Sequence, residues 1–138
     1  MDLGAGLSRP DHRPVLFIGD GSLQLTATEL GTLYQRVPQA VVFLLENRGY
    51  TVERCIQSPH AVYQDILAWD WPAVPAALGA PQVHTPRVGT LRGLAEGLAE
   101  VTDRPGDGFF ITVDLPMMDA PRLLRVLAEG IGTLNARD

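Results

Sequence analysis

The sequence has little cysteine, few basic residues and no long apolar run. Cys55 is its only cysteine, which excludes an internal disulfide and a zinc site built on cysteines. Acidic residues outnumber basic ones by 16 to 11, and no basic patch points to nucleic acid or to an anionic membrane. Its apolar runs fall far short of the ~20 residues that span a bilayer, and the N-terminus has no signal-peptide pattern. We therefore expect a cytoplasmic protein that binds neither nucleic acid nor membranes.

The composition that remains is typical of a folded domain. The chain has 138 residues, of which 46% are hydrophobic and 20% are charged. A chain of this length suits one domain and buries roughly 68% of the surface that it exposes when unfolded. We predict a single domain over residues 1–138.

Short apolar segments alternate with segments of helical periodicity. We predict strands at 15–18, 41–45, 83–85 and 109–113, and helices at 26–36, 50–56, 71–78, 91–101 and 123–131. Residues 1–13 are rich in glycine, proline and polar residues, which predicts a loop. Continuous branched runs are typical of strands buried on both faces, so we expect an α/β fold with a parallel sheet flanked by helices on both faces. Ligands of such sheets bind beyond the carboxyl ends of the strands.

Two of the predicted strands end in polar, glycine-containing corners. The first is followed by Gly-Asp-Gly-Ser, with Asp20 at its centre, and the second by Asn47 and Gly49. A carboxylate, an amide oxygen and a main-chain carbonyl are the ligands that Mg²⁺ prefers, and glycine lets a diphosphate approach the backbone. The corners predict a magnesium–diphosphate site, although each motif alone is also typical of a plain turn. No dinucleotide-binding or P-loop motif stands at either corner.

The two corners together resemble a known signature. "GDGS" followed by "ENRGYTVE" resembles the motif of thiamine-diphosphate-dependent enzymes. The later "YQDILAWDW", "ALGA" and "DAPRLL" resemble the pyruvate and indolepyruvate decarboxylase branch, so that the likeness runs from residue 3 to residue 130. It implies the C-terminal diphosphate-binding domain of a 2-oxo acid decarboxylase, apparently truncated, whose sheet lacks its first strand and helix. We expect such a sheet to expose an edge strand.

The resemblance assigns a cofactor role to residues of both corners. It implies that Asp20, Asn47 and the Gly49 carbonyl bind Mg²⁺. It also implies that the diphosphate lies against four residues, which are Gly19, Gly21, Ser22 and Tyr50. Glu46 replaces the first asparagine of the family's Asn-Asn pair, which places an extra negative charge near the site.

The same resemblance assigns substrate roles to the helix after the second corner. Glu53 matches the acid of the branch's Gly-Tyr-Thr-[Ile/Val]-Glu stretch, which implies proton transfer around the substrate. Val52 and Ile56 are implied to line the substrate pocket. From the residues alone, a solvent-facing glutamate and two aliphatic core positions are the alternatives.

The family resemblance also limits what this chain can do alone. It implies non-oxidative decarboxylation of a 2-oxo acid to an aldehyde and CO₂. That reaction needs a glutamate on a pyrimidine-binding domain, usually supplied by a second subunit, and nothing in this sequence matches that domain. We expect a homo-oligomer or a complementary subunit to supply it. A catalytically inert remnant and an interaction module derived from the domain are the alternatives.

Overall fold

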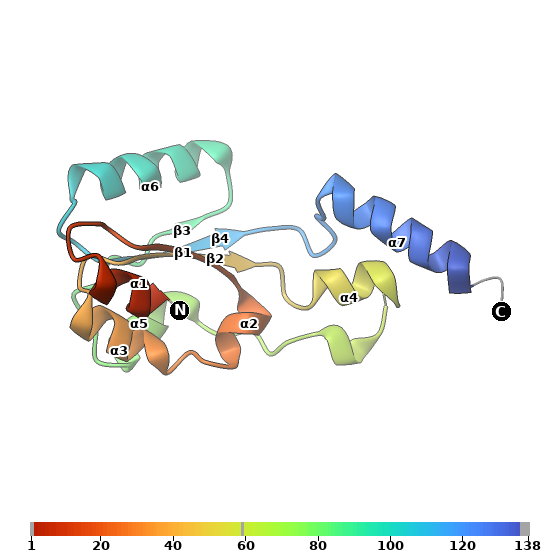
Figure 1. The fold of residues 1–138 in the computed structure, drawn as a ribbon, viewed down its shortest axis with the longest axis horizontal. Helices are drawn as coiled ribbons and strands as arrows, with labels where there is room; N and C mark the ends of the chain where they lie inside the picture. Colours follow the sequence, from red (N-terminus) through yellow and green to blue (C-terminus); the bar gives the residue numbers. More distant parts are fainter. Residues whose placement is uncertain (1, 59, 136–138) are drawn as a thin grey trace.

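The fold is built on a four-stranded parallel sheet. The computed structural model describes residues 2–58 and 60–135 (Figure 1). Within them, β1 (Val15–Gly19), β2 (Val41–Glu46), β4 (Phe109–Asp114) and β3 (Arg87–Val88) pair in that order. All three pairings are parallel, and β2 lies in the middle with Val41 opposite Val15 on one side and Phe109 on the other. The predicted α/β class with a parallel sheet is confirmed.

Helices cover both faces of this sheet. On one face lie α1 (Asp2–Ser8), α3 (Glu29–Arg36) and α5 (Val74–Ala77), and on the other lies α6 (Leu91–Asp103) (Figure 1). Side chains of β2 alternate between the two cores: Val42 and Leu44 pack with the α3 side, and Val41 and Phe43 with the α6 side. The alternation follows from the two-residue repeat of a strand.

The remaining helices gather at the carboxyl ends of the strands. α2 (Asp20–Gln24) begins directly after β1, and α4 (Thr51–Ile56) begins shortly after β2. α7 (Arg122–Asn135) follows β4 and packs beside α4 beyond the end of the sheet (Figure 1). Two short 3₁₀ helices, Val62–Gln64 and Trp71–Ala73, lie in the connection from α4 to α5. Both polar corners therefore lie at one end of the sheet, where α2 and α4 begin.

Several element boundaries differ from the sequence predictions. The predicted loop at 1–13 contains α1, and the helix predicted at 26–36 is preceded by α2, which a turn separates from α3. The third strand lies at Arg87–Val88; of the residues predicted at 83–85, His84 forms an isolated parallel bridge to Phe109, and Val83 is held in a turn by its N–H bond to the Ala80 carbonyl. The helix predicted at 71–78 opens as a 3₁₀ turn with Pro72 at its start. The sequence also predicts a loop over residues 57–65 around Pro59; this segment contains the 3₁₀ helix Val62–Gln64, and Pro59 lies outside the described residues.

β1 is an edge strand. Among the described residues it pairs only with β2, and Val15 and Phe17 are 48% and 66% exposed. The prediction that this strand is buried on both faces is wrong, whereas the predicted exposed edge is present. No helix among the described residues has the length and apolar character needed to cross a bilayer.

Candidate metal and diphosphate site

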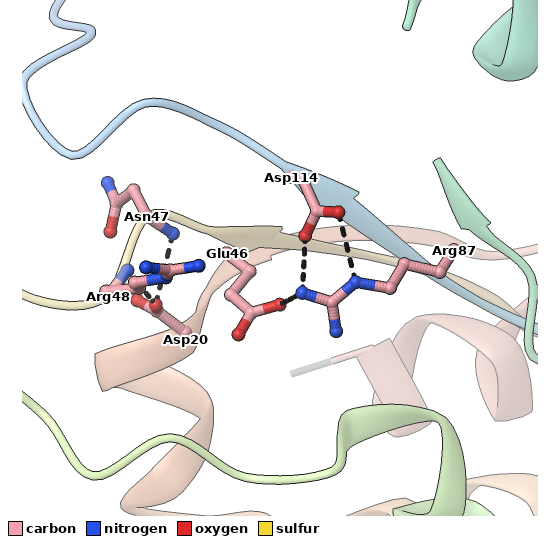
Figure 2. Close-up of polar contacts among 6 residues, drawn as sticks. All are labelled: Asp20, Glu46, Asn47, Arg48, Arg87 and Asp114. Carbon is pink, nitrogen blue, oxygen red and sulfur yellow. Dashed lines mark hydrogen bonds and ion pairs between the residues drawn. The ribbon is translucent and has the colours of Figure 1, made fainter. Parts of the chain in front are cut away.

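Asp20 joins the two polar corners. Its side chain is only 1% exposed, and its Oδ1 accepts the Gly21 N–H at 2.8 Å. Its Oδ2 accepts the N–H groups of Asn47 at 3.1 Å and Arg48 at 2.7 Å (Figure 2). Main-chain donors therefore compensate the burial of this carboxylate and fix its direction. The structure brings Asp20 and Asn47 together, as the strand-end argument predicts.

The backbone after β2 is turned by an unusual conformation. Arg48 has a φ of 64° and Gly49 a φ of 151°, both in the region that L-residues with side chains rarely adopt. A Cβ atom at Gly49 would lie 2.3 Å from the Gln64 carbonyl oxygen, so only glycine fits there. The turn aims the N–H groups of Asn47 and Arg48 at one carboxylate, and it brings the Gly49 carbonyl beside the Asn47 amide.

Three oxygen atoms converge at this turn. The Asn47 Oδ1 atom lies 2.8 Å from the Gly49 carbonyl oxygen and 3.3 Å from Asp20 Oδ1, although none of the three carries a proton. Reversing the Asn47 amide would remove this conflict. However, Thr51 Oγ1 donates its one proton to the Met117 carbonyl at 2.7 Å and therefore accepts from Asn47 Nδ2, also at 2.7 Å. The bond from Thr51 to Met117 favours the orientation in which the amide oxygen lies on the converging side.

This arrangement fits a hard divalent cation. In an octahedral Mg²⁺ site with bonds of ~2.1 Å, neighbouring ligand oxygens lie about 3 Å apart. The observed spacings of 2.8 and 3.3 Å match that geometry. Among the described residues no group of three His, Cys, Asp or Glu side chains could hold a metal, so the candidate site depends on one carboxylate, one amide and one main-chain oxygen.

A cavity of about 190 Å³ opens beside the three oxygens. Its lining includes all four residues of the predicted diphosphate contact, Gly19, Gly21, Ser22 and Tyr50, and also Val52 and Glu53. The Tyr50 ring packs on Gly21, where a Cβ atom would lie 2.7 Å from the ring. Ile56, one turn further along α4 than Val52, is not among the lining residues. The structure thus gathers every predicted site residue except Ile56 around one cavity.

A comparison with known sequences identifies the family. The family described as "Thiamine pyrophosphate enzyme, C-terminal TPP binding domain" matches residues 1–113. The chain belongs to this family. The resemblance drawn from the two corner motifs is confirmed.

Similar proteins of this TPP-binding family are bacterial. An alpha-keto-acid decarboxylase of Mycolicibacterium paratuberculosis is 42% identical over 122 residues, which cover 88% of this chain and 22% of that protein. The alpha-keto-acid decarboxylase of Mycobacterium tuberculosis strain H37Rv is 40% identical over the same length. That of Mycobacterium leprae is 38% identical over 127 residues. The chain thus spans 22% of the length of these relatives.

The Glu46 side chain of this TPP-binding domain is paired with the guanidinium group of Arg87. It is 7% exposed and accepts from Arg87 Nη2 at 2.5 Å, and the same guanidinium forms two bonds to Asp114, at 2.6 and 3.0 Å (Figure 2). Burial raises the pKa of Glu46, Arg87 opposes the rise, and Asp114 and Asp20 add to it. The hydrogen bond to Asp114 is the main reason that the pKa of Arg87 is raised. The extra negative charge expected at Glu46 therefore has a cationic partner.

Sequence reasoning missed Arg87 and Asp114. Asp114 is the last residue of β4 and lies opposite Glu46. It therefore stands at the carboxyl end of a strand, as the two polar corners do, and the same reasoning could have found it. Arg87 could not be found in this way, because its strand was predicted at 83–85.

A second cavity of about 450 Å³ adjoins the TPP-binding corner. Gly19, Asn47, Thr51 and Val52 line both cavities. Its other walls are mostly apolar and come from the ends of β2 and β4 and the start of α7: Leu45, Leu115, Asp119, Ala120, Pro121 and Leu124. Val52 therefore lies between the cavity beside the three oxygens and a largely apolar one.

Proposed function

We propose that this chain binds Mg²⁺ and the diphosphate of thiamine diphosphate, and that it takes part in the non-oxidative decarboxylation of 2-oxo acids to an aldehyde and CO₂. Its membership of the TPP-binding family and the relatives named alpha-keto-acid decarboxylase support the proposal. The motifs after Asn47 favour the pyruvate and indolepyruvate branch. In this proposal, residues 1–138 act as one diphosphate-binding domain.

One observation carries the metal assignment. With the Asn47 amide in the orientation that the Thr51–Met117 bond favours, the oxygens of Asp20, Asn47 and Gly49 converge without a proton between them, and a cation would make such a cluster favourable. Asp20, Asn47 and Gly49 would hold the cation, and diphosphate oxygens and water would complete its coordination. Because Asp20 is held by backbone N–H groups, it needs little rearrangement when the cation binds.

The residues around the metal have separate tasks in this proposal. Gly21 and Ser22 present backbone groups to the diphosphate, and Tyr50, which lines the same cavity, packs on Gly21. The cofactor, when bound, would supply an electron sink for the reaction. Glu53, exposed at the cavity wall, holds and delivers the proton that the substrate carbon takes up. Val52 contacts the substrate, and the apolar cavity beside Val52 excludes water from it.

A complementary domain completes the site in this proposal. No residue implied to activate the cofactor's pyrimidine ring is found in this sequence, and the chain spans only 22% of its relatives. A second copy of a longer chain or a separate subunit would supply that residue. We expect the purified chain to release no aldehyde from 2-oxo acids, Mg²⁺ and cofactor; appreciable turnover would contradict this part.

Calorimetry tests the site. Thiamine diphosphate is titrated into the parent chain, Asp20→Ala and Asp103→Ala, each with Mg²⁺ and with EDTA. We expect Mg²⁺-dependent binding by the parent chain, a loss of at least about 100-fold in Asp20→Ala, and no change in Asp103→Ala, where the carboxylate is exposed at the end of α6. Binding that needs no metal or tolerates Asp20→Ala would overturn the assignment. No binding at all would favour an inert domain.

A further inference from the structure

We infer that Thr51 is a positioning residue: its hydrogen bond to the Met117 carbonyl decides which end of the Asn47 amide faces the metal site. The inference rests on the proposed metal-binding function and adds to it a residue that does not touch the metal. Thr51 is 7% exposed and begins α4, one turn after Asn47.

The Asn47 amide has two orientations with different consequences. In the first, Nδ2 donates to Thr51 Oγ1 and the amide oxygen faces Asp20 and Gly49, ready for a cation. In the reversed one, the amide nitrogen donates to the Gly49 carbonyl at 2.8 Å and to Asp20 Oδ1 at 3.3 Å, while its oxygen accepts from Thr51. The reversed amide donates to the oxygens of Gly49 and Asp20 and closes the metal site.

The single proton of Thr51 distinguishes these two orientations. A hydroxyl that donates to Met117 has only lone pairs left for Asn47, which selects the orientation open to the cation. If the same proton turned to Asn47, the Met117 bond would be lost and the closed orientation would be favoured. The main-chain carbonyl of Met117 is therefore part of the metal site's support.

The segment that carries Met117 is itself anchored to the site. Its Leu115 N–H bonds to the Glu46 carbonyl at 2.9 Å, and the Asp119 N–H bonds to the Pro116 carbonyl at 3.0 Å, which closes a turn around Met117. Leu115 and Asp119 also line the apolar cavity beside Val52. The connection from β4 to α7 thus fixes both a wall of that cavity and, through Thr51, the direction of a metal ligand.

A double-mutant cycle tests the inference. Mn²⁺ binding is measured by electron paramagnetic resonance, with and without thiamine diphosphate, in the parent chain, Thr51→Val, Asn47→Asp and the double variant. Valine keeps the shape of threonine but not its hydroxyl. An aspartate at position 47 offers an oxygen to the metal in either orientation, so it needs no orienting partner.

We expect Thr51→Val to weaken Mn²⁺ binding about tenfold when residue 47 is asparagine, and by less than about twofold when it is aspartate. Thr51→Ser, which keeps the hydroxyl, should restore parental affinity. An equal loss in both backgrounds, or no loss in either, would overturn the inference, because a merely structural role for Thr51 does not depend on residue 47.

The same titration separates this inference from the proposed function. If the parent chain binds Mn²⁺ and Asp20→Ala does not, the metal site stands, and the cycle decides the role of Thr51 alone. If the parent chain fails to bind Mn²⁺, or Asp20→Ala binds it equally well, the proposed function fails and the inference fails with it. Asp103→Ala serves as the matched control for the loss of one carboxylate far from the site.

Discussion

Both ends of the sheet hold polar clusters, but only at the carboxyl end do acceptor oxygens face one another without a donor between them. At the amino end, Arg13 donates to the carbonyls of Gln39 at 2.8 Å, Val101 at 2.5 Å and Asp107 at 2.5 Å, and its guanidinium lies over the Phe109 ring. At the carboxyl end, oxygens of Asp20, Asn47 and Gly49 face one another. The amino-end cluster balances its donors against its acceptors, whereas the carboxyl-end cluster, with the Asn47 amide oxygen facing Asp20 and Gly49, has an excess of acceptors that a cation would balance.

The comparison teaches how to separate a structural cluster from a ligand site. Polar side chains and main-chain carbonyls gather at both ends, so their number does not distinguish the two. The two clusters are distinguished by the balance between hydrogen-bond donors and acceptors. An excess of converging acceptors favours a ligand, whereas a balanced cluster is complete without one. We therefore expect changes at the amino end to affect stability alone, and changes at the carboxyl end to affect metal binding.

Replacing Arg13 gives the largest expected loss of stability. Arg13→Met removes the donors to three carbonyls from different segments, so the free energy of unfolding should fall by about 2–4 kcal/mol. Arg13→Lys keeps the charge but not the planar fork and should recover only part of the loss. Urea unfolding measures both. A changed Mn²⁺ affinity of the folded Arg13→Met chain would contradict the distinction between the two ends of the sheet.

Adding a methyl group at Gly49 should damage the carboxyl end. The positive φ and the Gln64 carbonyl at 2.3 Å from the added Cβ both oppose Gly49→Ala, so we expect a loss of about 2 kcal/mol in stability and more than tenfold in Mn²⁺ affinity. The matched control is Gly79→Ala, where φ is 88° but no atom lies within 4 Å of the added Cβ. That control should cost only about 1 kcal/mol and leave metal binding intact. Equal effects of the two changes on metal binding would contradict the assignment.

Removing Arg87 should leave Glu46 without its cationic partner. Arg87→Met should lower the free energy of unfolding by about 1–2 kcal/mol, less than for a fully buried pair because the side chains of Arg87 and Asp114 are 41% and 42% exposed. Adding Glu46→Gln should restore most of that loss, as measured by thermal unfolding. If the double variant is no more stable than Arg87→Met, Glu46 is not the residue that Arg87 compensates.

The smallest expected effect is a pH dependence from Glu46. Burial raises its pKa, so the folded chain holds this proton more tightly than the unfolded chain. Stability from this group is therefore present below the ordinary glutamate pKa of about 4.3 and is lost as the pH rises through the raised value. As the pH rises through that interval, the free energy of unfolding of the parent chain should fall relative to that of the Glu46→Gln variant. A difference that does not vary with pH would argue against the raised pKa.

The sequence predicted most of the sheet and the location of the site. β2 and β4 are continuous branched and aromatic runs, so burial on both faces could be read directly from them. β3 has two residues and is set by its pairing with β4, and the glycine-rich segment that forms α1 has no clear helical pattern. Asp20 and Asn47 could be placed together because the carboxyl ends of parallel strands meet at one edge.

The supporting contacts of the site could not be predicted. Thr51 bonds to a main-chain carbonyl 66 positions away, and Arg87 reaches Glu46 across 41 positions. Neither contact leaves a periodicity or a motif in the sequence, because one partner is a backbone atom and the other depends on the exact register of a two-residue strand. Sequence thus located the proposed ligands, and three-dimensional packing was needed to find what orients them.

Anomalous diffraction from a crystal of this chain grown with Mn²⁺ and thiamine diphosphate tests the central claim most directly. The account predicts one strong manganese peak bonded at about 2.2 Å to Asp20 Oδ1, Asn47 Oδ1 and the Gly49 carbonyl, with Thr51 still bonded to Met117. A peak elsewhere, or an Asn47 amide nitrogen donating to the Gly49 carbonyl while cofactor is bound, would contradict it.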